Sequence, residues 1–123
     1  MTELRVAPTR VAQVLSGSDR LAAYRLHAEL CKVLTDPKRL MILDALRQGE
    51  QSVTGLAAQL QISLANASQH LSVLRHAGLV EVRRAGTTMH YRLSEPRITQ
   101  ACDIVNAIVV SRLGTGWRLG GEV

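Results

Sequence analysis

Residues 51–80, QSVTGLAAQLQISLANASQHLSVLRHAGLV, constrain the fold of this chain more than any other stretch. Two short helical patterns are joined there by a tight connection, and each begins after a serine, the residue type preferred as an N-terminal cap. The apolar positions that would pack these helices together are Leu56, Leu60, Ile62, Ala67, Leu71, Leu74 and Leu79. The pattern predicts a helix-turn-helix whose second helix, capped by Ser63, carries a polar face with no core to enter.

The sequence after residue 78 changes from helical to alternating periodicity. We expect one strand over residues 79–83 and a second over 88–93, joined by a turn at 85–87 that contains Gly86. Two such strands form a hairpin. A hairpin directly after a helix-turn-helix is a wing, and its tip is expected around residues 83–87.

Three further helices are expected around this unit. Asp36 as N-cap and Pro37 as first helical residue begin a helix that continues over residues 38–48. Its expected buried residues are Leu40, Ile42, Leu43 and Leu46. A helix over 19–34 carries two adjacent apolar stripes, a surface broad enough for its own domain and a partner. The last helix, over 97–113, carries one strong apolar stripe.

The predicted fold is therefore mainly α with a small β-hairpin, a winged helix-turn-helix. Residues 1–18 are expected to form an N-terminal arm or a short helix. Residues 19–113 would form the domain itself, and residues 114–123 a loose tail rich in glycine.

Composition narrows the classes of function. The 123 residues carry a formal net charge of +5, and 13 of the 15 basic residues are arginine, which suits forked contacts with phosphate or guanine. With a helix-turn-helix, this balance favours double-stranded DNA as a partner. No apolar run is long enough for a membrane span and the N-terminus lacks a signal-peptide core, so we expect a cytoplasmic protein. A phosphate loop, paired carboxylates and a nucleophile motif are all missing, so neither an enzyme nor a cofactor is expected.

Two segments now point to a family. LTDPKRLMILDAL, residues 34–46, closely resembles the L-x-D-P-x-R-L-x-I-L signature of the ArsR (ArsR/SmtB-type) family of bacterial winged-helix repressors. ISLANASQHLSVLRHAGLVEVRRAGTTMHYRL, residues 62–93, is similar to that family's recognition helix and wing. The resemblance covers roughly residues 21–112. It implies a homodimer that forms through the first and last helices, and a repressor released from its operator by an effector.

The candidate DNA contacts lie on the second helix of the helix-turn-helix and on the wing. They are Ser63, Leu64, Ala65, Asn66, Ser68, Gln69, His70, Arg83, Arg84 and Arg92. Ser63 can donate to a phosphate, the two apolar residues after it can touch thymine methyls, and the next polar residues can reach base edges. The alternative is that Ser63 only caps, Ser68 only packs, and the other polar or charged side chains are simply solvated.

The effector is less constrained by the sequence. Residues 52–56 contain no thiol where the family's metal sensors place cysteines. Glu95, Arg97, Ile108 and Ser111 stand where the family's zinc site has its Asp, His and Glu ligands. We therefore predict no metal site.

Cys31 and Cys102 are the remaining candidates for an effector site. In the family arrangement both lie at or near the dimer core, where redox or reactive-sulfur chemistry could bridge them. His27, one helical turn before Cys31, could join such a site. The alternatives are two core thiols, a metal- or arsenical-responsive repressor, or a winged-helix module that binds proteins instead of DNA.

Overall fold

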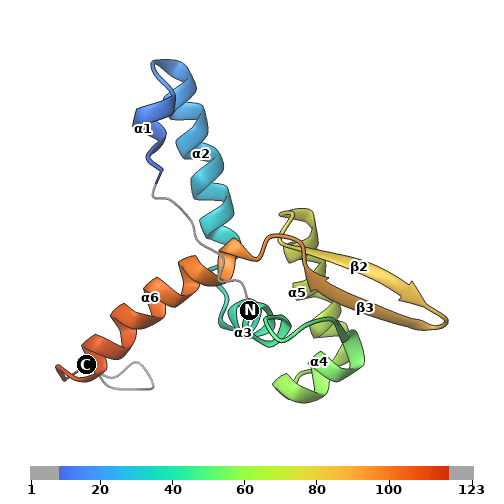
Figure 1. Ribbon diagram of the computed structural model, residues 1–123. Helices are drawn as coiled ribbons and strands as arrows, with labels where there is room; N and C mark the ends of the chain where they lie inside the picture. The colour runs from blue at the N-terminus through green and yellow to red at the C-terminus, as the bar shows by residue number, and fades with distance from the viewer. Residues whose placement is uncertain (1–8, 117–123) are drawn as a thin grey trace.

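The computed structural model describes residues 9–116, which form six helices and three short strands in that range (Figure 1). In chain order the elements are α1 (Val11–Val14), α2 (Ser18–Val33), α3 (Pro37–Leu46), β1 (Gln51–Ser52), α4 (Val53–Leu60), α5 (Leu64–His76), β2 (Val80–Ala85), β3 (Thr88–Leu93) and α6 (Arg97–Leu113). The short N-terminal helix is thus present as α1. The first eight residues of the expected arm and most of the expected tail lie outside the described residues.

The predicted helix-turn-helix is confirmed as α4 and α5. Ser52 Oγ accepts from the backbone N–H of Gly55 at 3.0 Å, and Ser63 Oγ accepts from that of Asn66 at 3.0 Å, so both expected caps are present. Between the helices, Gln61 adopts a left-handed conformation with φ of 57°. Gln61 ends α4 as its C-cap, and residues 61–63 form the short connection to α5.

Helix α3 completes the core of this unit. Asp36 Oδ1 accepts from the backbone N–H groups of Lys38 at 2.7 Å and Arg39 at 3.3 Å, as an N-cap ahead of Pro37 should. The largest fully buried side chains come from α3, α4 and α5 and are Ile42, Leu43, Leu56, Leu71 and Leu74. Leu40 was expected among them but is 39% exposed. The prediction that Leu40 is buried was therefore wrong.

The wing is an antiparallel hairpin that is longer than the sequence suggested. β2 continues to Ala85 instead of ending at residue 83, because the ladder extends to the pair Ala85–Thr88 beside the turn. Gly86 sits in that turn with φ of +62°, a conformation that favours glycine. A third strand, β1, was not predicted. It pairs with β3, giving the sheet order β1-β3-β2.

Helices α2 and α6 extend away from this core, and the hairpin extends on a different side (Figure 1). No residue of α2 is buried, and α6 buries only Ile98 and Thr99 near its start. Arg39 ties the end of α2 to α3, since its Nε donates to the carbonyl of Val33 at 2.6 Å. Between residues 9 and 116, no helix has both the length and the apolar character needed to cross a bilayer.

Candidate nucleic-acid interface and thiol-lined cavity

The recognition helix α5 divides into a buried side and an open side. Ala67, Leu71 and Leu74 are fully buried against the other helices. The open side carries most of the residues predicted to contact DNA, namely Ser63, Leu64, Ala65, Asn66, Ser68 and Gln69. The same spacing that fills the core therefore leaves these six residues, most of them small or polar, exposed.

His70 is placed differently from its neighbours on the predicted surface. Its side chain is only 14% exposed, and its Nε2 lies 3.9 Å from Oδ1 of Asp36, the cap of α3. Burial raises the pKa of the Asp36 carboxyl, while the two backbone N–H groups it caps and the nearby His70 lower it, with a net lowering. His70 thus contacts the start of α3 as well as bordering the open side of α5.

The three arginines predicted on the wing are not equivalent. Arg83 forms a forked ion pair with Glu50, with Nη2–Oε1 at 2.5 Å and Nε–Oε2 at 3.3 Å. Arg92 pairs with Glu81 across the hairpin. Arg84 donates to the carbonyl of Gly86 at the turn and pairs with no carboxylate in the part of the chain that the structure describes. Arg84 is therefore the wing arginine of the three whose guanidinium has no acidic partner among the described residues.

Glu50 is a functional candidate that the sequence did not reveal. It precedes β1, and the pairing of β1 with β3 brings it to Arg83 and within 3.9 Å of His90 Nδ1. The hydrogen bond from Arg83 holds the pKa of the Glu50 carboxyl below its usual value. The only signal in the sequence was an acidic residue 33 positions before a wing arginine, which carries no information about contact.

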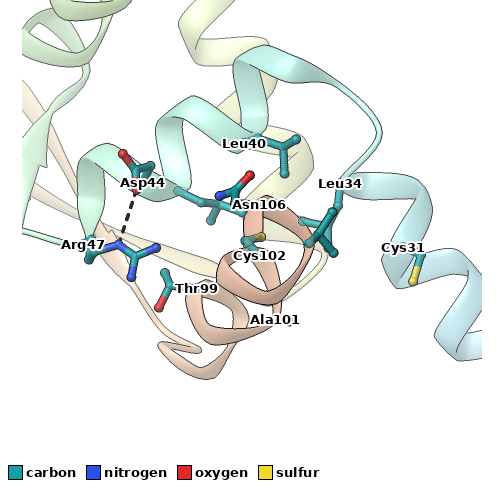
Figure 2. A pocket seen from close by; sticks show the side chains of 11 residues that line it. Cys31, Leu34, Leu40, Asp44, Arg47, Thr99, Ala101, Cys102 and Asn106 are labelled. Carbon is teal, nitrogen blue, oxygen red and sulfur yellow. Dashed lines mark ion pairs between the residues drawn. The ribbon is translucent and has the colours of Figure 1, made fainter. Parts of the chain in front are cut away.

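Both cysteines line a single cavity at the junction of α2, α3 and α6 (Figure 2). Its volume is about 240 Å³, and its lining residues are Cys31, Leu34, Leu40, Leu43, Asp44, Arg47, Thr99, Ala101, Cys102, Val105 and Asn106. Leu40, the apolar residue missing from the core, forms part of this lining. The two thiols are free, with Cys31 exposed and Cys102 partly buried.

The charges around Cys102 are arranged in a small network. Burial raises the pKa of the Cys102 thiol, Asp103 and Asp44 raise it further, and Arg47 opposes them. Arg47 itself donates to both carboxylate oxygens of Asp103, at 2.7 and 3.0 Å, and its Nε lies 3.4 Å from Asp44 Oδ1. The sequence did not reveal Arg47 and Asp103 because their pairing spans 56 positions.

Other expected features of the effector site stand apart from this cavity. His27 is not among its lining residues and instead stacks on Tyr24, with ring centroids 6.4 Å apart. Across residues 9–116, no three His, Cys, Asp or Glu side chains gather in a way that could hold a metal ion.

Comparisons with known proteins place this architecture in a family. Residues 36–82 match the model of the bacterial regulatory protein family arsR. The biofilm growth-associated repressor of Agrobacterium fabrum is 43% identical over 81 residues, which are 66% of this chain and 69% of that protein. The chain belongs to the ArsR family and is a transcriptional regulator with a DNA-binding winged helix.

Two further matches bear on how far the likeness extends. The homodimeric winged helix-turn-helix DNA-binding domain of Mb0332 from Mycobacterium bovis superposes with a TM-score of 0.71 at 31% identity, covering 84% of this chain and 95% of that one. The HTH-type transcriptional regulator Rv0324 of Mycobacterium tuberculosis is 37% identical over 97 residues, 78% of this chain. The chain spans only 43% of the length of that longer relative.

Proposed function

We propose that this chain is a homodimeric repressor that binds a duplex operator and releases it when its cysteines are modified. DNA binding is supported chiefly by the exposed residues of α5, most of them small or polar, while Ala67, Leu71 and Leu74 of the same helix are buried in the core. A helix with one face packed and the other free has the shape needed to enter a major groove.

Roles on the DNA follow from chemistry and position. Asn66 and Gln69 are exposed amides on α5, suited to bidentate contact with adenine. Ser63 and the free N–H groups at the start of α5 suit a phosphate. On the wing, Arg84 is the first candidate for the backbone, whereas Arg83 and Arg92 reach a phosphate only by exchanging their carboxylate partners.

The two projecting helices support a dimer. Large apolar side chains remain uncovered on α2 and α6, including Leu26 at 73% exposure and Ile104 at 67%. Exposed apolar surface of this extent marks a protein interface. The Mb0332 domain, which shares this fold, is described as homodimeric. A twofold pair would present two α5 helices to successive half-sites about 34–36 Å apart.

The shared cavity supports a thiol response. Cys31 comes from α2 and Cys102 from α6, so a bond between them would join two of the helices that carry the exposed apolar surface. With a tetrasulfane, H2S4, two thiols give one four-sulfur bridge, made of the two cysteine sulfurs and two sulfurs from the tetrasulfane, and two molecules of hydrogen sulfide, so the cysteines are oxidised and the tetrasulfane is reduced. A direct disulfide needs Cα atoms roughly 4.4–6.8 Å apart, and a longer sulfur chain bridges a wider gap.

DNA binding is tested with a duplex selected from random sequences by the reduced protein. We expect a footprint with two half-sites, and an affinity that falls steeply as salt rises because phosphate contacts release counterions. Absence of any salt-dependent duplex binding would instead indicate a protein-interaction module.

The thiol response is tested on the same duplex with wild-type protein, Cys31→Ser and Cys102→Ser. Sodium tetrasulfide should lower the affinity of the wild type, with a mass change that involves both cysteines, and leave the two variants bound. Release by zinc or arsenite with both serine variants still responding would replace the thiol response with a metal or arsenical one.

A further inference from the structure

The ion pair between Arg47 and Asp103 joins α3 to α6 beside the thiol-lined cavity. Both carboxylate oxygens of Asp103 accept from the guanidinium, at 2.7 and 3.0 Å, in the forked geometry that makes such pairs directional. Arg47 is the C-cap residue of α3, where a positive charge is favoured by the helix dipole. The side chains are 33% and 53% exposed, so this is a half-open link and not a core contact.

This pair lies close to the point where α6 leaves its own domain. Its buried residues, Ile98 and Thr99, lie in the first turn. Beyond Asp103 the large apolar side chains are open, from Val109 at 38% to Val110 at 68% exposure. Within the described residues, the Arg47–Asp103 link therefore lies where α6 leaves the core, one residue after Cys102.

Helix α3 contacts both the helix-turn-helix core and the thiol-lined cavity. Its buried face, including Leu43 and Leu46, packs in the same core as α4 and α5. Leu43 also lines the cavity that contains Cys102, together with Leu40 and Arg47 of the same helix (Figure 2). At its N-terminus, Asp36 faces His70 of the recognition helix. A displacement passed from α6 to α3 is thus applied directly to the unit that carries α5.

We propose that Arg47 and Asp103 are positioning residues that couple chemistry at Cys102 to the placement of the DNA-binding helices. This inference rests on the proposed thiol response. A sulfur bridge from Cys102 to Cys31 ties α6 to α2 across the cavity that both thiols line, so forming the bridge shifts α6 against α3. With the forked pair intact, the shift is transmitted to α3. Without it, α6 pivots about its first turn and α3 stays where it is.

The charges predict a second, independent effect of breaking the pair. Asp103 and Asp44 disfavour the Cys102 thiolate and Arg47 favours it, in addition to the effect of burial. Replacing the Asp103 carboxylate by an amide removes one negative neighbour and frees Arg47 from its main partner. The pKa of the Cys102 thiol should therefore fall, so the thiol should react at lower pH. The effect of its modification on DNA affinity should become smaller.

The test compares Asp103→Asn with a conservative variant, Asp103→Glu, and a matched control, Glu95→Gln. Glu95 forms an equally forked pair with Arg97, at 2.5 and 2.8 Å, but the two residues are neighbours at the start of α6, so this pair does not link α6 to α3. Arg47→Gln breaks the same link from α3, should Asp103→Asn fold poorly. The measured quantity is the ratio of dissociation constants for the selected duplex after and before treatment with sodium tetrasulfide.

We expect the wild type to show a ratio of at least about tenfold, within the usual range of allosteric coupling. Asp103→Asn and Arg47→Gln should reduce it to below about threefold, with Asp103→Glu and Glu95→Gln close to wild type. An unchanged ratio in both Asp103→Asn and Arg47→Gln overturns the inference alone. A wild-type ratio of one overturns the thiol response itself, and the coupling with it.

A pH profile of alkylation at Cys102, measured in a Cys31→Ser background, separates coupling from a merely structural role. Asp103→Asn should move the profile to lower pH and Glu95→Gln should not. An unmoved profile for Asp103→Asn contradicts the assigned charge network.

Discussion

The two halves of this molecule differ in how completely they bury their own apolar residues. In the half formed by α3, α4, α5 and the hairpin, the five largest buried side chains have essentially no exposure. In the half formed by α2 and α6, apolar side chains of similar size stand open, and α2 buries none. The first half has a closed apolar core within one chain, and we call it the core half. The second half leaves its apolar helix faces exposed in the single chain, and we call it the open half.

The two halves therefore differ in what stabilises them: contacts within one chain in the first, and contacts between two molecules in the second. Contacts within the α3–α5 core are made by one chain and do not depend on concentration. Contacts that cover α2 and α6 require a second molecule, so their contribution follows mass action. The DNA-reading surface belongs to the first half and the cysteines lie where the two halves meet. Control of DNA binding through the second half is therefore physically reasonable.

The largest expected effect is a loss of stability in the core half. Leu74→Ala removes a fully buried side chain from the core and should lower the free energy of unfolding by about 2–5 kcal/mol. Urea denaturation at several protein concentrations measures it, and the loss should be the same at each. A loss below about 0.5 kcal/mol would mean that α5 is not packed as described.

The next largest effect is expected on dimer formation through the open half. Ile104→Asp places a charge on α6 at a side chain 67% exposed in the single chain, which should leave the fold intact and prevent dimer formation. Losing the second half-site should weaken operator binding by about a hundredfold or more. Sedimentation and DNA titration measure the two results, with Gln59→Asp, an exposed position on α4, as the control. A dimer that survives Ile104→Asp would place the interface elsewhere.

The recognition surface was predictable because its signals are local. The caps at Ser52 and Ser63, the start at Asp36-Pro37 and the alternation of the hairpin each involve neighbours a few residues apart. Helical spacing then decides which side of α5 is buried. No knowledge of distant contacts was needed.

The missed features all depend on distant contacts. β1 has two residues, too few for a periodic pattern, and it exists because β3 lies beside it. Glu50–Arg83 and Arg47–Asp103 join residues 33 and 56 positions apart. Leu40 was assigned to the core for its apolar character, but its side of α3 lines the cavity between the two halves.

A smaller effect is expected from a base contact made by Gln69 of α5, in the core half. If Gln69 reads a base, Gln69→Ala should cost roughly 1–3 kcal/mol of binding on the selected duplex and much less on random DNA. Gln59→Ala, the same change at an exposed position on α4, should cost neither. Equal affinities for wild type and Gln69→Ala would remove base recognition from this residue.

The smallest expected effect concerns the wing. Glu50→Gln removes the partner of Arg83, freeing a guanidinium for phosphate, so binding should tighten by about two- to threefold and the salt slope should steepen by about one. The pKa of Glu50 is lowered, so the pair is present above the ordinary carboxylate range and is lost only as pH falls through the lowered value. Titrations at neutral pH therefore compare a paired with an unpaired Arg83. Weaker binding by the variant would show that Glu50 holds the wing in a DNA-competent position.

The most direct test of the thiol response follows one preparation through a full cycle. Affinity for the selected duplex and intact mass are measured on the reduced protein, after sodium tetrasulfide, and again after dithiothreitol. We expect the affinity to fall as sulfur is added at Cys31 and Cys102 and to return when the thiols are restored. Undiminished affinity with both cysteines modified would contradict a thiol-controlled repressor.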